Sequence, residues 1–297
     1  MRSDAPADRR YLRTALGLIV GFMVVEVVMA VVSGSLALFA DAGHMLTDAG
    51  AIAGSVWAMR LAERPVSRAW SFGLKRAEIL SAAGNGMSLV VAGALILVEA
   101  IRRLVHPPPV EGLALLVVAV VGIGVNVAAT WVLSRASRES LNVQGAFQHV
   151  LTDLYAFIAS AVAGALIYTL GYRRADPAVS LLVVALMLRA AWKLLRASGR
   201  ILLQGTPDGV DLDEVRRHIT ELAEVVSVHD LHAWTLTSAL PVLSAHVVIE
   251  DRCLDDGSAA QVLDRLQGCL AGHFDVEHST FQLEPATHAA HEPGAHH

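Results

Sequence analysis

Long stretches of apolar residues fill the first two thirds of the chain. Six of them are each close to the ~20 residues that a helix needs to cross the hydrocarbon core of a bilayer. Short segments rich in Gly, Pro, Ser and charged residues separate them, as is typical of turns. The expected spans are residues 12–32, 36–61, 77–101, 113–133, 145–170 and 177–203. This pattern predicts an all-α membrane domain of six helices.

From Thr206 onward the apolar residues are spaced as in a soluble domain. Residues 211–224 and 259–270 carry apolar side chains on one stripe, which predicts two amphipathic helices. Shorter alternating segments predict strands; they are 226–235, 241–249 and 276–283. The order α-β-β-α-β predicts a compact α+β sheet with helices on one face. A domain of about eighty residues has a thin core, so we expect it to pair with a copy of itself.

These patterns divide the chain into three parts. Residues 1–206 form the expected six-span domain, and residues 207–285 the small α+β domain. Residues 286–297 have no apolar periodicity and are expected to form a flexible tail. Histidines recur in the tail, at His288, His291, His296 and His297. They are candidate metal ligands because imidazole is a common ligand for transition metals.

Composition agrees with a membrane protein. The chain has 297 residues, of which 54% are hydrophobic and only 17% charged, which is too apolar for an ordinary soluble protein. The net charge of −5 gives no basic surplus, so nucleic acid is not an expected partner. Two cysteines, Cys253 and Cys269, are too few for a disulfide framework.

The distribution of Lys and Arg predicts the orientation of the spans. Basic residues concentrate in the N-terminal arm, in the second-to-third and fourth-to-fifth connections, and at the end of the sixth span. The opposite side carries only Arg102, Arg103, Arg173 and Arg174. Because the cytoplasmic side of a membrane protein carries the excess of Lys and Arg, both termini are expected in the cytoplasm.

Two polar pairs interrupt the second and fifth apolar stretches. Each is a histidine followed four residues later by an aspartate, His44 with Asp48 and His149 with Asp153. Residues four apart share one face of a helix. An ionisable side chain at the centre of a spanning helix costs roughly 2.5–3.5 kcal/mol, so these residues indicate a function. The two pairs together supply four ligands, as many as a tetrahedral divalent metal site requires.

Polar contacts between helices are the simpler explanation for a single buried histidine, but two such repeats at matching depth favour metal ligation. Two imidazoles and two carboxylates suit zinc, cadmium or cobalt, whereas manganese and magnesium sites offer more oxygen. The choice among the first three metals stays open. Asp41 lies two turns before Asp48 on nearly the same face. Its role stays open between helix packing, gating and an entrance ligand.

Four segments together resemble the cation diffusion facilitator family, in its zinc-transporting branch. They are SLALFADAGHMLTD at 35–48, SFGLKRAE at 71–78, HVLTD at 149–153 and HDLHAW at 229–234. The resemblance implies a homodimer in the membrane that exports Zn²⁺ in exchange for protons and has no enzymatic activity. It implies six spans and a cytosolic ferredoxin-like domain that senses metal. The compact size favours a bacterial inner membrane.

The family resemblance also assigns roles to individual residues. It implies that His44, Asp48, His149 and Asp153 form the transport site. In the soluble domain, His232, His246 and Glu284 match the regulatory zinc ligands of the family. His288 and His291 could complete that shell, whereas His229 is expected simply at the surface.

Two other classes of function compete with transport. An intramembrane metalloenzyme could use the same ligands, but two His and two Asp would leave no vacant position for water. The sequence also lacks the His-Glu-x-x-His motif of many zinc proteases. A membrane zinc sensor that signals without transport is the other alternative.

Overall fold

The structure, a computed structural model, divides into two compact units, Met1–Gly199 and Arg200–His297. It describes residues 5–33, 36–106, 112–136, 140–172, 174–238, 240–273 and 278–289.

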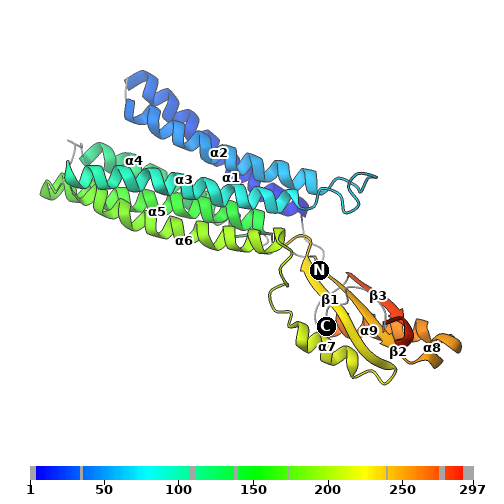
Figure 1. The fold of residues 1–297 in the computed structure, drawn as a ribbon. Coiled ribbons are helices and arrows are strands. Elements are labelled where there is room, and N and C mark those ends of the chain that lie inside the picture. The colour runs from blue at the N-terminus through cyan, green and yellow to red at the C-terminus, as the bar shows by residue number, and fades with distance from the viewer. Residues whose placement is uncertain are drawn as a thin grey trace. The chain divides into compact units, whose positions relative to one another are not determined.

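The described part of the first unit consists mainly of six long helices (Figure 1). They are α1 (Ala5–Ser33), α2 (Leu36–Ala62), α3 (Ala77–Val105), α4 (Gly112–Leu133), α5 (Leu141–Leu170) and α6 (Ala175–Leu202). Each coincides with one expected span, to within a few residues except at the start of α1. Within the described residues, α4, α5 and α6 each contain a segment long and apolar enough to cross a membrane. The others are 27 to 29 residues long; their crossing the membrane stays a prediction.

Helix α5 is the element that the first unit is built around, because it packs against α2, α3 and α4. Its ends are well defined. The Ser140 side chain accepts a hydrogen bond from the backbone N–H of Val143, and Gly171 closes the helix with a φ of 65°. A serine N-cap and a left-handed glycine are the usual helix-terminating residues. The resulting helix holds His149 and Asp153 on its buried face.

A polar junction ties α2, α3 and α5 together. The Asn85 side chain donates to Ser55 Oγ at 3.0 Å, and the Asn142 side chain donates to the Ser55 carbonyl at 2.8 Å. All three residues are buried. Ser55 follows Asp48 by two helical turns and Asn142 precedes His149 by two. Contacts at both levels therefore hold α2 and α5 antiparallel and in one register.

Helices α4 and α5 can approach closely because residue 122 of α4 is a glycine, which has no side chain. A Cβ atom added at Gly122 would overlap the ring of Phe157, whereas one added at Gly124 would meet no atom within 4 Å. We expect Gly122→Ala to lower the free energy of unfolding by roughly 1–3 kcal/mol, because an extra carbon forces a well-packed contact apart. Thermal unfolding of the detergent-solubilised protein measures this. Gly124→Ala is the matched control, and equal melting temperatures for the two variants would contradict the packing argument.

The second unit is a three-stranded sheet with helices (Figure 1). Strand β2 (Pro241–Ile249) lies between β1 (Val225–Thr235), to which it is antiparallel, and β3 (His278–Glu284), to which it is parallel. Helices α7 (Leu212–Thr220), α8 (Asp251–Asp255), α9 (Ala259–His273) and α10 (Ala286–Ala289) complete it. The expected order α-β-β-α-β is present, with the short α8 and α10 added. Part of the segment expected as a flexible tail therefore forms α10.

The core of the second unit joins the sheet to its two longer helices. Val215 and Ile219 of α7, Leu243 of β2 and Val262 and Leu266 of α9 are fully buried in one cluster. The spacing of Val215 and Ile219 is the one that the amphipathic pattern predicts. This unit thus has an apolar core separate from the helical one.

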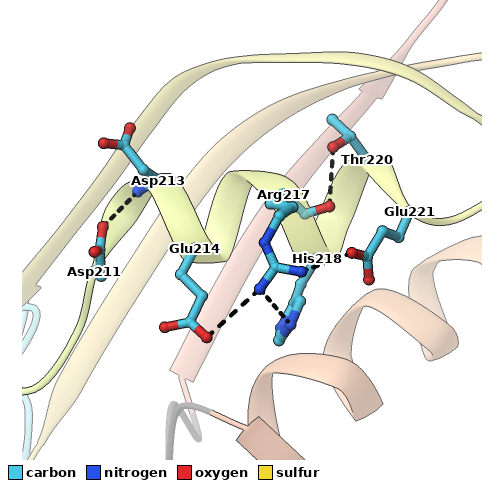
Figure 2. A network of polar contacts seen from close by, with 7 residues as sticks. All are labelled: Asp211, Asp213, Glu214, Arg217, His218, Thr220 and Glu221. Carbon is cyan, nitrogen blue, oxygen red and sulfur yellow. Dashed lines mark hydrogen bonds and ion pairs between the residues drawn. The ribbon is translucent and has the colours of Figure 1, made fainter.

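The exposed side of α7 carries a charged network (Figure 2). Asp211 caps the helix by accepting a hydrogen bond from the Asp213 backbone at 2.9 Å. One turn further on, Arg217 pairs with Glu221 at 2.8 Å and with Glu214 at 3.6 Å. Exposed pairs of this kind contribute little individually, so α7 is held mainly by its buried face.

Candidate metal centres

Asp48, His149 and Asp153 form a buried cluster between α2 and α5, which we call the helix cluster. Asp48 is on α2, and the other two residues are on α5. His149 Nε2 lies 2.7 Å from Asp48 Oδ1, in a hydrogen bond, and 4.0 Å from Asp153 Oδ2. One ligand atom from each residue lies within 4.8 Å of the others. The two sequence motifs, about a hundred residues apart, thus meet at one point.

The helix cluster is almost fully enclosed. Asp48, His149 and Asp153 are 4%, 6% and 9% exposed. Two buried carboxylates beside one imidazole form an arrangement that is costly unless a cation or protons balance the charge. This donor set therefore fits a divalent metal or protons equally.

The fourth expected ligand, His44, belongs to α2 one turn before Asp48. Its side chain lies outside the described residues, as does that of Asp41. The participation of His44 therefore stays a prediction.

A cavity of about 120 Å³ opens beside the two aspartates. It is lined by Ile19, Met45, Asp48, Asn126, Asp153, Ala156, Phe157 and Ser160. Water in the liquid occupies about 30 Å³ per molecule, so the cavity has room for an ion with some of its hydration water. The Asn126 side-chain amide donates to the Gly122 carbonyl at 3.0 Å. Asn126 and Ser160 were not among the predicted site residues; a polar residue in an apolar span was their only signal.

His229, His246 and Glu284 form a second group in the sheet, which we call the sheet cluster. His229 and His246 are register partners on β1 and β2, with ring centroids 5.1 Å apart. Glu284, at the end of β3, places one oxygen 2.6 Å from His229 Nε2 and the other 3.9 Å from His246 Nδ1. Glu284 is only 2% exposed. Three strands thus bring two imidazoles to one buried carboxylate.

The expectation that His229 is a surface residue is wrong, since it is 5% exposed. His232, the predicted ligand on the same strand, is exposed and pairs in register with Ser244 instead of His246. The cause is an irregularity in the β1 register between His229 and His232, where Asp230 has a φ of 46°. Such a bulge shifts the alternation of side chains by one residue. His232 Nε2 still lies 3.9 Å from Asp230 Oδ1, at the rim of the cluster.

Of the two candidate tail ligands, only His288 lies within the described residues. His288, on α10, approaches Glu284 with its Nε2 at 3.7 Å from Oε2. Its side chain is about half exposed, so it could close the outer side of the sheet cluster. His291 lies outside the described residues.

Two segments of the chain match the domains of one protein family. Residues 12–203 match the cation efflux transmembrane domain, and residues 207–286 match the cytoplasmic domain of cation efflux proteins. The chain belongs to the cation diffusion facilitators, the family of cation efflux proteins. Members of this family are transporters, not enzymes, and the chain is accordingly an integral membrane protein with a transmembrane and a cytoplasmic domain.

Individual relatives match this cation diffusion facilitator over nearly its whole length. The zinc transporter ZitB of Shigella flexneri is 40% identical over 99% of this chain and 93% of its own. The metal cation efflux system protein CzcD of Cupriavidus metallidurans is 40% identical over 94% of this chain and 87% of its own. A cadmium, cobalt and zinc/H⁺-K⁺ antiporter of Bacillus velezensis is 35% identical, with 95% and 90% covered.

A domain of a relative of known structure is among the solved structures that match this chain. It is the metal-bound C-terminal domain of the CzcD transporter from the same Cupriavidus species, 41% identical, covering 25% of this chain and 99% of its own. The TM-score is 0.23.

Proposed function

We propose that the chain is a Zn²⁺/H⁺ antiporter that exports zinc from the cytosol through His44, Asp48, His149 and Asp153. The observation that carries the proposal is the 2.7 Å contact between Asp48 and His149, which joins the two predicted ligand pairs. Relatives described as zinc transporters and as a cadmium, cobalt and zinc antiporter support zinc as the main cargo, with cadmium and cobalt as further candidates.

Proton exchange follows from the chemistry of the helix cluster. Metal ligands must be deprotonated, so zinc and protons compete for the same imidazole and carboxylate atoms. Histidine titrates near neutral pH, which lets a modest pH difference shift that competition. In the absence of metal, the Asp48–His149 hydrogen bond provides a place for a proton. Release of zinc to the far side can therefore be coupled to the uptake of protons.

The energetics favour exchange over simple export. Moving two positive charges outward against ~100 mV costs roughly 4.6 kcal/mol, and each returning proton recovers about 2.3 kcal/mol. A pH difference of one unit adds about 1.4 kcal/mol per proton. One proton without a pH gradient is therefore insufficient, and two protons only balance the electrical cost. A pH gradient that is acidic outside supplies the remaining driving force, and it must be larger for one proton than for two.

The arrangement in the membrane is part of the proposal. We place all six long helices across the inner membrane of a bacterium with both termini in the cytoplasm, as the distribution of basic residues predicts. The second unit is then a cytosolic ferredoxin-like domain, through which two copies of the chain pair. The match to the cytoplasmic domain of cation efflux proteins supports this part.

We further propose that the sheet cluster binds a regulatory zinc ion through His229, His246 and Glu284. Two imidazoles and one carboxylate are a common zinc donor set. His288 is available as a fourth ligand, since it approaches the same carboxylate. The structure favours His229 over His232 because the buried carboxylate of Glu284 lies against His229.

A comparison of the two histidine variants tests this assignment. In a full-length Asp48→Asn background, which weakens the helix cluster, we expect His229→Ala to lower the affinity for zinc at the sheet cluster at least about tenfold. Loss of a ligand removes a metal bond, whereas the exposed His232 contributes none. Isothermal titration with Zn²⁺ measures both variants, with His232→Ala as the matched control. The opposite order of effects would return the role to His232.

Uptake of zinc into proteoliposomes tests transport itself. A pH gradient that is acidic on the zinc-free side is expected to drive accumulation of Zn²⁺ inside, and collapse of the gradient is expected to slow it. Protein that binds zinc in titration but never moves it across the bilayer would instead support the membrane zinc sensor.

A further inference from the structure

A second, larger cavity lies between the beginning of α1 and the end of α4. Its volume is about 570 Å³, and its lining comes from two segments of the chain. They are Ala7, Arg10, Tyr11 and Thr14 on α1, and Trp131, Val132 and Arg135 on or just after α4. The two helices pack against each other, so these residues share one level of the helical unit. The cavity is distinct from the one beside the helix cluster, with which it shares no lining residue.

Two arginines give this cavity its charge. Arg10 is on α1 and Arg135 follows the end of α4, and the lining contains no carboxylate. Arg135 stacks on Trp131, with its guanidinium carbon 3.9 Å from the ring centroid. Among the described residues, neither Arg10 nor Arg135 takes part in an ion pair. The cavity therefore presents two guanidinium groups that no acidic side chain of this lining neutralises.

Neighbouring charges do not cancel this positive patch. Arg9, beside Arg10, is already paired with Glu63 at 2.6 Å. Asp8 is 3% exposed and does not line the cavity. Among the described residues, Glu63 is thus committed to Arg9 and Asp8 is buried, so neither lies in the cavity beside Arg10 and Arg135.

The position and lining of the cavity match a membrane interface. It lies at the first turns of one long helix and the last turn of another, where a spanning helix leaves the hydrocarbon region. Trp and Tyr concentrate at this depth, and Arg side chains reach from it toward the headgroups. Trp131 and Tyr11 provide apolar walls, and the two guanidinium groups provide the polar part. On the proposed topology this end faces the cytosolic leaflet, where basic pockets between helices recognise anionic headgroups.

We propose that the α1–α4 cavity binds the headgroup of an anionic phospholipid, of the phosphatidylglycerol type. A phosphodiester carries one negative charge and oxygens that an arginine can grip with two parallel hydrogen bonds. Arg10 on α1 and Arg135 just after α4 would clamp one phosphate and so hold the two segments together. The aromatic walls favour a lipid, which continues into the bilayer, over a free anion. The site is independent of the metal ligands.

The test uses the full-length protein in detergent and native mass spectrometry. We expect the wild type to retain phosphatidylglycerol at least about tenfold more than phosphatidylcholine with the same acyl chains. Arg10→Gln combined with Arg135→Gln is expected to abolish this preference. Arg13→Gln, on the same helix but outside the lining, is the matched control and is expected to keep it. An unchanged preference in the double variant would overturn the proposal.

Two further measurements distinguish a lipid from a free anion and locate the bound lipid. If millimolar inorganic phosphate displaces phosphatidylglycerol as efficiently as added lipid does, the cavity is a general anion site and the lipid assignment is wrong. A phosphatidylglycerol with a photoreactive group on its glycerol is expected to label residues 7–14 and 131–136 of the wild type. Labelling confined to other segments would refute the location even if the double variant did not fold.

Discussion

Asparagine in place of Asp48 abolishes zinc uptake driven by a pH gradient, if the helix cluster carries the cargo. The variant keeps the size of the side chain and removes one negative charge from a site that is 4% exposed. Removing one partner of a buried charged pair costs roughly 3–5 kcal/mol, which corresponds to about two to four orders of magnitude in binding. We therefore expect flux in reconstituted vesicles to fall at least about 100-fold, measured with a zinc-sensitive dye.

A matched acid elsewhere in the first unit serves as the control for this experiment. Glu99 is half exposed and paired with Arg103 at 2.8 Å, close to the end of α3. Glu99→Gln removes the same charge from a helix of similar length and is expected to leave flux within about twofold of the wild type. Undiminished flux in the Asp48→Asn protein would defeat the site assignment, whatever the control shows.

The affinity for zinc is expected to fall steeply as the pH is lowered. If zinc displaces one proton from the helix cluster, the dissociation constant rises about tenfold for each unit of pH below neutrality, and about 100-fold if it displaces two. The sign follows because protons occupy the ligand atoms that the metal needs. Titration of a Glu284→Gln protein at pH 7 and pH 6 measures the slope at the helix cluster.

His149→Gln tests the origin of this dependence. Glutamine cannot titrate, so the variant is expected to bind zinc more weakly and with a smaller slope against pH. Proton release on addition of zinc, followed with a pH indicator in weak buffer, gives an independent count. An affinity that does not change between pH 7 and pH 6 in the Glu284→Gln protein would remove the basis for proton exchange.

The helices could be predicted because the thickness of a bilayer sets the length of the apolar run that each spanning helix needs. Apolar runs of the required length ended at Gly, Pro and charged residues, and the observed ends of α2 to α6 lie within a few residues of the predicted ones. The pairing of Asp48 with His149 could also be anticipated, since four-residue spacing fixes a face and burial of two acids requires a partner. The length of the apolar runs carried the first inference, and helix periodicity carried the second.

The details of the sheet cluster could not be predicted in the same way. The family resemblance grouped His232 with His246, whereas the structure pairs His229 with His246, with a bulge at Asp230 between the two candidate histidines. A bulge depends on the neighbouring strand, so a single segment gives little sign of it. Likewise, Glu284 lies against His229 because β3 pairs in parallel with β2. The register of these strands is set by the whole sheet and not by one segment. The cavity beside Asp153 depends on how α1 and α4 pack, which hydropathy does not encode.

The junction at Ser55 and Asn142 has a consequence for how the protein could move. Because α2 and α5 are fastened to each other at two heights, a sliding of one along the other would have to break a polar contact at each height simultaneously. Partial slippage would leave a buried amide or carboxylate without its neighbour, which is unfavourable away from water. We therefore expect α2 and α5 to move together as one rigid body. Access to the ion would then switch sides when the other helices move relative to this pair.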